Sequence, residues 1–440
     1  MRLATTGPLR REIVRRFPER PFAIEFWDGT AVPPTRDGGP TFKVRSPSAV
    51  AYALRAPGQL GLGRAYVSGG LDVDDLDGAL EVVNRWIPPE LTARDRLKLM
   101  LAAARASGTV TSPTPPAAEL RPRGGLHSKH RDARAVRHHY DVSNEFFALF
   151  LDRSMTYSCA FFSRDGASLE SAQEAKLELT CRKLGLEQGQ RVLDVGCGWG
   201  AFAIHAAGRY GVEVVGITLS EPQAALARAR VREAGLEDRV SIRVLDYRDL
   251  ADERFDAIAS IGMIEHVGDD RIDLYADRLA RLLTPGGRLL NHGIARLNHI
   301  AGKAGPFTER YVFPDSDPLP VSRVLLSVER AGFVTEHVEE FGADYVETLR
   351  HWARRLDQHR AEAVRLVGEE RVRVWRLYLR SARKNFESGW VSVYQVQSRL
   401  GRRWSSGGRP SLGRAVGEDP VIDQVGERVD PPAQLGLGQA

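Results

Sequence analysis

Residues 191–220 read RVLDVGCGWGAFAIHAAGRYGVEVVGITLS, and this stretch decides the fold of the chain. An apolar run of strand length is followed at once by Gly196, Gly198 and Gly200, then by a stretch of helical spacing and a second apolar run. Three closely spaced glycines let the chain turn sharply and let a ligand approach the backbone. This order predicts a ligand at the carboxyl edge of a parallel sheet, beside a helix N-terminus. The alternative interpretation is a glycine-rich turn that binds nothing.

Apolar runs and helical stretches continue to alternate on the C-terminal side. Seven strands are predicted, at residues 191–196, 212–218, 240–245, 255–261, 287–295, 333–341 and 391–397. Helical stretches separate the early strands, which predicts an α/β fold with a mostly parallel sheet and helices on both faces. Between the last two strands, residues 345–389 form a long amphipathic helical insertion, whose apolar stripe indicates packing in the core.

Composition divides the chain into four parts. Short strands are predicted within residues 23–32 and 40–47, whereas 49–86 has helical spacing with glycine-bearing connections. The predicted parts are an α+β N-terminal domain (1–105), a Pro-, Ser-, Thr- and Gly-rich linker (106–126), a C-terminal α/β domain (127–402) and a flexible tail (403–440).

Composition also limits compartment and partners. No apolar run approaches the roughly 18–20 residues of a transmembrane helix, and the N-terminus lacks the apolar segment of a secretory signal. The three cysteines are far apart and odd in number, which favours reduced thiols in a cytoplasmic protein over disulfides or a metal site. The net charge is +5, but residues 121–139 carry six Lys/Arg and four His against one Asp. Such a run suits nucleic acid, an anionic membrane or a solvated linker.

The glycine turn, G-x-G-x-G preceded by Asp194, resembles motif I of class I S-adenosylmethionine-dependent methyltransferases. Its backbone N–H groups are expected to bind the methionine carboxylate and amine. The second strand ends ITLSEPQ, with no acid before Glu221, so Ser220, Gln223, a backbone group or Glu221 itself must bind the ribose. Asp246, after the third strand, is placed to accept from the adenine amino group or to cap a helix.

Two further features point to chemistry on a cation. Glu265 follows the fourth strand, where a carboxylate can accept a proton or neutralise a developing positive charge, or form a surface ion pair instead. Its neighbour His266 is interpreted as a helix-start residue. Residues 138–162 mix aromatic with polar side chains, and aromatic faces stabilise cations; the alternative is an amphipathic helix packed on the sheet.

Together these motifs resemble the cyclopropane-fatty-acyl-phospholipid synthases, a family that includes mycolic acid cyclopropane synthases and fatty-acid methylene synthases. The resemblance covers nearly the whole chain. The motifs that carry it are, in order, GLGRAYVSGGLDVDDLD, HYDVSNEFF, LDRSMTYSCAFF, LDVGCGWG, ITLSEPQ, DYRD, MIEHVG, RYVFPDSDPLP and DYVETLRHW.

The resemblance implies a set of site residues. The S-adenosylmethionine contacts carry over to Tyr140, Tyr157, Ser158, Gly196, Gly198, Thr218, Ser220, Gln223, Asp246 and Tyr247, beside Asp194 and Gly200 of the turn. Many members hold a bicarbonate as general base, and the matching pocket here is Cys159, Glu265, His292, Ile294 and Tyr345. No metal is implied.

Two segments depart from the family pattern. LLNHGIAR around His292 replaces the LHTIG usual in cyclopropane synthases, and Ala382 stands where many members have a cysteine once taken for a nucleophile. A covalent thiol mechanism at position 382 is therefore excluded. NHGIARL and the chain's last helical stretch are closer to the actinobacterial enzymes that make 10-methylene, later 10-methyl, stearate.

The resemblance implies methyl transfer to the double bond of an acyl chain in a membrane phospholipid, through a carbocation, to give a cyclopropane or a 10-methylene product. It implies peripheral contact with the anionic inner face of the plasma membrane, through residues 121–139 or the N-terminal domain, no nucleic acid, and, by analogy, a homo-oligomer. A methylene product needs a separate reductase, because no nicotinamide or flavin motif is present. The alternatives are a small-molecule or nucleic-acid methyltransferase of the same fold and a non-catalytic lipid-binding protein.

Overall fold

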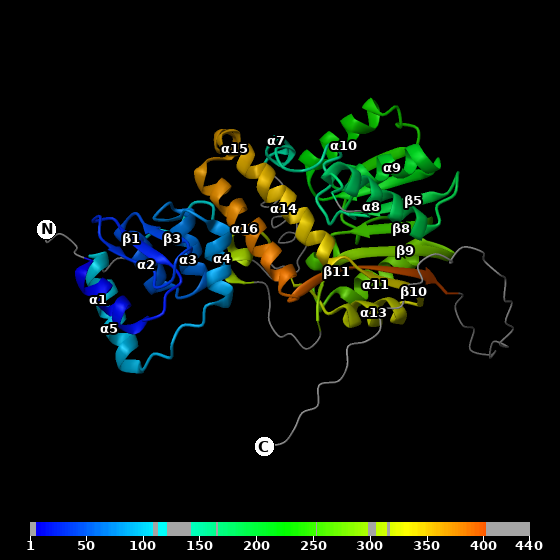
Figure 1. Cartoon of the computed structure of the whole chain (residues 1–440). Helices are drawn as coiled ribbons and strands as arrows, with labels where there is room; N and C mark the ends of the chain where they lie inside the picture. The colour runs from blue at the N-terminus through cyan, green and yellow to red at the C-terminus, as the bar shows by residue number, and fades with distance from the viewer. Residues whose placement is uncertain are drawn as a thin grey trace, which may run out of the picture. The chain divides into compact units, whose positions relative to one another are not determined.

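The computed structural model describes residues 6–108, 113–120, 142–163, 166–251, 253–297, 305–314 and 317–401. Its centre is a seven-stranded sheet of order β10-β11-β9-β8-β5-β6-β7 (Figure 1). The strands are β5 (Arg191–Val195), β6 (Glu213–Thr218), β7 (Val240–Val244), β8 (Phe255–Ile261), β9 (Leu283–Arg296), β10 (Phe333–Glu340) and β11 (Val391–Leu400). The first five are parallel, and β11 pairs antiparallel with both β9 and β10.

All seven predicted strands are confirmed. β9 begins at Leu283 rather than at residue 287, because the chain already pairs with β8 through Phe255 before the Pro-Gly-Gly stretch that signals a turn. β5 lies beside both β6 and β8, so the strand order reverses at β5. In a doubly wound sheet this reversal opens a crevice at the carboxyl ends of the strands.

Helices cover both faces of the sheet (Figure 1). Apolar side chains of α8 (Leu169–Leu184), α9 (Ala201–Tyr210) and α10 (Glu221–Glu233) pack on one face. α11 (Ile272–Leu282) and α13 (Val321–Arg330) pack on the other. Alternate residues of β5 serve the two layers: Val192 faces the first, and Leu193 and Val195 the second.

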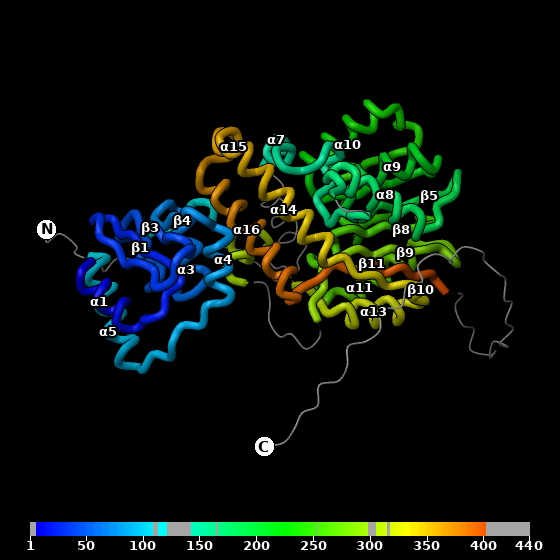
Figure 2. Tube along the Cα trace, in the orientation of Figure 1, coloured from blue at the N-terminus to red at the C-terminus, as the bar shows by residue number. Residues whose placement is uncertain are grey.

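The helical insertion forms its own core beside the sheet. It consists of α14 (Gly342–Gln358), α15 (Arg360–Val367) and α16 (Glu369–Glu387), with α14 and α16 side by side (Figure 2). Its apolar stripe packs on β11 and on residues 146–160, which begin within the short helix α7 (Asn144–Ala148). Trp352 and Trp375 are almost wholly buried there. The predicted role of the stripe as core is confirmed.

The N-terminal region has a second sheet, of order β2-β1-β3-β4. Its elements are α1 (Gly7–Arg16), β1 (Ala23–Phe26), β2 (Ala31–Val32), β3 (Thr41–Val44), α2 (Pro47–Arg55), α3 (Gln59–Val67), β4 (Leu71–Val73), α4 (Leu76–Arg85) and α5 (Ala93–Ser107). β4 lies inside the stretch predicted to be helical. Its three residues adopt a strand because they pair antiparallel with β3, a contact that local spacing does not reveal.

Ion pairs join this region to α16. They are Arg373–Asp72 at 3.3 Å, Arg380–Asp77 at 3.1 Å, Arg383–Asp77 at 2.7 Å and Lys384–Glu81 at 2.6 Å. In the predicted linker, Glu119 pairs with Arg64 of α3 at 2.6 Å and accepts a hydrogen bond from Tyr311 of α12 (Pro306–Tyr311) at 3.2 Å. No helix among the described residues is both long and apolar enough to span a bilayer.

Candidate active site

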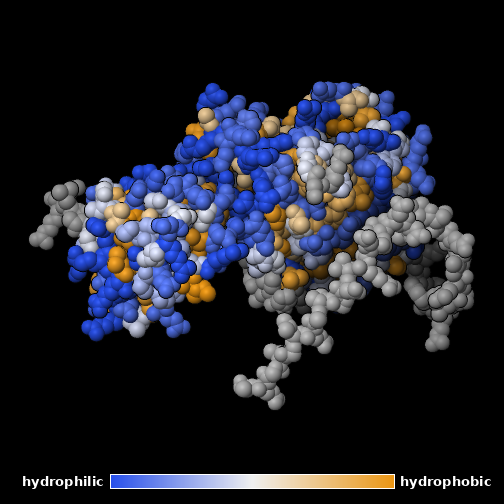
Figure 3. Space-filling view, in the orientation of Figure 1, coloured by the Kyte–Doolittle hydropathy of each residue, from blue (hydrophilic) through white to orange (hydrophobic). Residues whose placement is uncertain are grey.

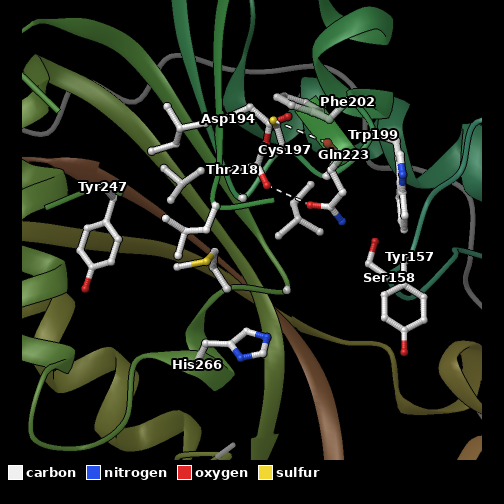
Figure 4. Close-up of a pocket in the computed structure, with 18 of the residues that line it drawn as sticks. Tyr157, Ser158, Asp194, Cys197, Trp199, Phe202, Thr218, Gln223, Tyr247 and His266 are labelled. Carbon is white, nitrogen blue, oxygen red and sulfur yellow. Dashed lines mark hydrogen bonds between the residues drawn. The ribbon is translucent and has the colours of Figure 1, made fainter. Parts of the chain in front are cut away.

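A pocket opens at the carboxyl ends of β5, β6 and β8, where the strand order predicts a ligand (Figure 4). Nine residues predicted to bind the cofactor line it: Tyr157, Ser158, Asp194, Gly196, Gly198, Thr218, Gln223, Asp246 and Tyr247. Tyr247 lies on one side, and Tyr157 and Ser158 on the other. We call this the cofactor pocket.

Two residues predicted for this site are placed differently, and a third lies outside the described residues. Gly200 is the N-cap of α9 and Ser220 is the N-cap of α10, where its hydroxyl accepts from the N–H of Gln223. Both therefore shape the loops from behind the pocket wall. Tyr140 lies outside the described residues.

The glycine turn is closed by its own hydrogen bonds. The N–H groups of Gly196 and Cys197 both donate to the carbonyl of Ile217, at 3.0 and 2.9 Å, and that of Gly200 donates to Cys197 at 2.9 Å. All three turn glycines have positive φ, from 53° to 81°. These three N–H groups are engaged within the protein, so the charged end of a ligand needs other partners as well.

The part of the pocket after β6 and β7, where the sequence predicts the ribose and the adenine, is lined by polar side chains that bond to one another. Thr218 donates to Gln223 Oε1 at 2.9 Å (Figure 4). Glu221, by contrast, is exposed and pairs with Arg228. Gln223, rather than Glu221, therefore lines the predicted ribose site. Asp246 forms a two-point ion pair with Arg248, at 2.5 and 2.8 Å, and does not cap a helix.

A second pocket adjoins the first and shares Tyr157, Ser158, Gly262 and His266 with it. We call it the acceptor pocket. All five residues predicted for the base site line it: Cys159, Glu265, His292, Ile294 and Tyr345. The rest of its wall is mainly apolar and aromatic, and includes Phe313, Tyr378, Ala382, Phe386, Trp390, Val391 and Val393. Because Ala382 lines it, the position carries no thiol toward this pocket.

Glu265 is held in this pocket by the backbone. It lies in η1 (Ile264–His266), and its Oε1 accepts from the N–H of Ile294 at 2.7 Å. Its Oε2 is buried with no hydrogen-bond partner. Burial raises the pKa of Glu265 to about 7, against the opposing effect of the Ile294 N–H.

His292 is neutral and its tautomer is fixed. Lys183 donates to Gln395 Oε1 at 2.6 Å, so the amide nitrogen of Gln395 faces His292 and donates to Nδ1 at 3.1 Å. The ring proton therefore sits on Nε2, which is buried without a partner. Burial lowers the pKa of His292 to about 3, and it raises that of the Cys159 thiol well above its usual range. Cys159 is therefore an uncharged wall residue.

The glycine that follows His292, where the cyclopropane synthase pattern LHTIG has a threonine, lies in close contact with Ile264. A Cβ at Gly293 would lie 2.3 Å from Cγ2 of Ile264 and 3.6 Å from Oε1 of Glu265. The glycine lets η1 press directly against β9, which brings the Glu265 carboxylate to the Ile294 N–H. A threonine at position 293, as in LHTIG, would require Ile264 to shift.

Three wall residues were missed from the sequence. His266 borders both pockets and is buried, where burial lowers its pKa to about 4; its interpretation as only a helix-start residue is incomplete. Tyr378 was assigned to core packing but also lines the acceptor pocket. Lys176 lines the cofactor pocket from α8. The available signal was its spacing of four residues from Ala172 and Thr180, which places Lys176 on the helix face that the structure buries.

The fold and the cofactor pocket define a class I S-adenosylmethionine-dependent methyltransferase. Residues 127–396 match the family model described as mycolic acid cyclopropane synthetase, and the chain belongs to this family. The family uses S-adenosylmethionine as methyl donor, and this chain is a methyltransferase that uses the same donor.

Relatives extend over most of the chain. A probable fatty acid methyltransferase of Mycobacterium tuberculosis is 40% identical over 89% of this chain and 95% of its own length. The cyclopropane-fatty-acyl-phospholipid synthase of Escherichia coli is 36% identical over 80% and 86%. A tuberculostearic acid methyltransferase of M. tuberculosis is 32% identical over 89% and 91%.

A solved structure supports the cofactor assignment. It is a mycolic acid cyclopropane synthase complexed with S-adenosylhomocysteine and a long-chain ammonium detergent. This structure is 34% identical to the chain, with a TM-score of 0.58, and the match covers 61% of this chain and 98% of that one.

Proposed function

We propose that this chain transfers the methyl group of S-adenosylmethionine to the double bond of an unsaturated fatty-acyl chain carried by a membrane phospholipid. The observation that carries the proposal is the acceptor pocket. It adjoins the cofactor pocket through a shared wall, its wall is mainly apolar and aromatic, and it holds the buried carboxylate of Glu265. A buried carboxylate in a mainly apolar and aromatic pocket suits a hydrocarbon acceptor whose reaction passes through a cation.

The walls support the first chemical step. An alkene is a weak nucleophile, so the enzyme must align it with the sulfonium methyl and exclude water. Attack on the methyl carbon releases S-adenosylhomocysteine and leaves a cation on the neighbouring chain carbon. Tyr157, Tyr345 and Tyr378 line the acceptor pocket, and their ring faces stabilise such a cation.

The second step removes a proton from the transferred methyl group. Ring closure with this loss gives a cyclopropane, whereas a hydride shift before it gives an exocyclic methylene. Glu265 Oε2 is a buried acceptor, His292 Nε2–H is a buried donor, and both residues line the acceptor pocket. This pair suits a bicarbonate, whose hydroxyl would donate to Glu265 and whose oxygen would accept from His292. Bicarbonate, when bound, supplies a mobile base between Glu265 and the acyl chain.

For the product we propose 10-methylene, the precursor of a 10-methyl branch. NHGIAR, with Gly293 against Ile264, departs from the cyclopropane synthase pattern. A tuberculostearic acid methyltransferase is among the relatives, and tuberculostearic acid carries a 10-methyl branch. A separate reductase would then act on the product.

Mass spectrometry of lipids from a bacterial host expressing the chain tests the proposal. We expect unsaturated acyl chains of phospholipids to gain one CH2, and proton NMR to show exocyclic methylene rather than cyclopropane signals. Ring signals would overturn the product assignment alone. If the acyl chains of the host remain unmodified although the purified protein binds S-adenosylmethionine in calorimetry, the proposed acyl-chain substrate would be overturned.

The pKa of Glu265 leads to a pH prediction. Since burial raises it to about 7, the carboxylate that accepts a proton is lost below that pH. We expect turnover at saturating cofactor to fall about tenfold per pH unit below about 7, and this inflection to vanish in Glu265→Gln. Burial also raises the pKa of Asp194 to about 7, so cofactor affinity is measured separately at each pH. A flat profile in the wild type would exclude Glu265 as the titrating group.

We further propose that helices α1 and α5 form the peripheral membrane contact. Together they carry eight cationic and two acidic residues, which gives a net charge of +6. The net charge of the whole chain is only +5. Both acids, Glu12 and Asp95, pair with Arg16, which leaves the other cations free of ion pairs within the described residues. Val14, Leu97, Met100 and Leu101 are about half exposed between these cations.

Mixed basic and apolar surface of this kind favours an anionic bilayer over water. Figure 3 shows hydrophobic residues interspersed with hydrophilic ones over the N-terminal region. The basic run of 121–139 lies outside the described residues, and its membrane role stays a prediction.

Vesicle binding tests the α1–α5 surface. Each cation near an anionic surface is worth about 1 kcal/mol, so Arg94→Gln with Arg96→Gln should weaken binding to phosphatidylglycerol vesicles about 30-fold. Leu97→Glu with Leu101→Glu should weaken it further, whereas Leu274→Glu, equally exposed on α11, serves as the matched control. Unchanged vesicle binding with a loss of oligomers would instead assign this surface to a second copy of the chain.

A further inference from the structure

Lys176 is a buried cation whose part in the reaction is unassigned. It lies on α8, is 1% exposed and lines the cofactor pocket together with Ser158 and Asp194. Its Nζ donates to Ser158 Oγ at 3.0 Å. An ammonium group has three donors, so one hydrogen bond to a neutral hydroxyl leaves most of its capacity unused.

No described carboxylate forms an ion pair with Lys176. Asp152 and Asp194 are near enough to favour its charged form, yet burial has the larger effect and lowers its pKa to about 8. An ammonium group removed from water is costly unless it is paired and hydrogen-bonded. The cofactor pocket therefore contains a cation whose burial the surrounding side chains only partly offset.

Asp194 presents the opposite charge in the same pocket. Its side chain is 2% exposed, and Oδ2 has no hydrogen-bond partner. The N–H groups of Gly196, Cys197 and Gly200 are engaged within the turn. A ligand with a carboxylate and an ammonium group on one carbon would therefore need side-chain partners in addition to the turn.

We propose that the ammonium group of Lys176 binds the α-carboxylate of S-adenosylmethionine. Ser158, held by Lys176, sits beside this contact, and Asp194 Oδ2 accepts from the α-ammonium group. Lys176 is thus a cofactor-positioning residue: it anchors the amino-acid end so that the sulfonium methyl lies at the wall shared with the acceptor pocket. Lys176 lines only the cofactor pocket and Glu265 only the acceptor pocket, which separates the two roles.

A ligand comparison in the wild-type protein is the first test. Decarboxylated S-adenosylmethionine keeps the adenosine, sulfonium and amine, and lacks only the carboxylate. A hydrogen bond between charged groups contributes about 1.5–3 kcal/mol. We therefore expect calorimetry to show a roughly 10- to 100-fold weaker affinity for decarboxylated S-adenosylmethionine. Equal affinities would overturn the proposal without any variant being made.

The second test assigns the discrimination to Lys176. Lys176→Met keeps a long apolar stem in the core and removes the charge. We expect it to weaken S-adenosylmethionine 10- to 100-fold, to leave the decarboxylated compound within about threefold, and so to abolish the preference. Arg182→Met, which removes an exposed cation from the same helix, should keep the preference. A Lys176→Met protein that still prefers S-adenosylmethionine, or that loses both ligands equally, would show that Lys176 only supports the fold.

Discussion

Glu265→Gln is expected to lower kcat by about 10²- to 10⁴-fold, the usual range for a lost general base. The amide keeps the size of the side chain, and its oxygen can still accept from the Ile294 N–H, which lies 2.7 Å from Oε1 in the wild type. It cannot take a proton from the transferred methyl or from a bound bicarbonate. Cofactor affinity should change by less than about tenfold, because Glu265 lines only the acceptor pocket.

The thermal stability of Glu265→Gln shows whether a loss of turnover comes from the chemistry or from unfolding. The pKa of Glu265 is about 7 in the fold and near 4.5 in the unfolded chain, so its ionisation costs stability as the pH rises from 4.5 to 7. At pH 8 this cost is on the order of 3 kcal/mol. Glu265→Gln should therefore melt no lower than the wild type at pH 8. Full turnover in Glu265→Gln would show that Glu265 is only structural. The control is Glu221→Gln, which removes an exposed acid on α10 and should keep wild-type turnover.

Gly198→Leu is expected to reduce S-adenosylmethionine affinity by more than about 100-fold. Gly198 has φ of 53°, lines the cofactor pocket, and has no heavy atom within 4 Å of the position its Cβ would take. The leucine side chain would occupy that open space, where the ligand must approach the backbone. Calorimetric titration measures the loss.

A matched glycine separates this steric effect from backbone strain. Gly235 has φ of 64° and equally open surroundings, but it follows α10 and lines neither pocket. Gly235→Leu carries the same left-handed strain, about 1–2 kcal/mol, and should bind cofactor normally. Equal loss in both variants would mean that Gly198 acts through stability rather than through contact with the ligand.

The sequence predicted those features that local pattern determines. Buried apolar runs gave all seven strands of the main sheet, and their carboxyl ends gave Asp194, Asp246 and Glu265. β4 was missed because three residues become a strand only by pairing with β3. Gly200 and Ser220 were placed at the ligand because a cap and a contact have the same sequence signature at a helix start.

The remaining site residues depend on tertiary packing. Lys176 lies on a helix and Tyr378 on the insertion, and nothing near either in sequence shows which pocket they will face. The tautomer of His292 depends on Gln395 and Lys183, which come from another strand and another helix. Such features follow from the assembled fold, not from spacing.

The ion pairs along α16 couple the N-terminal region to the wall of the acceptor pocket, which matters for protein engineering. One side of this helix faces Asp72, Asp77 and Glu81 of the N-terminal region, and its other residues, among them Tyr378 and Phe386, form the wall of the acceptor pocket. A C-terminal half expressed alone would lose the N-terminal partners of α16, and its cations would keep only their pairs with Asp357, Glu369 and Glu387. Chimeras that exchange N-terminal regions between relatives should therefore alter activity on the acyl substrate, even though the residues that line the acceptor pocket are retained.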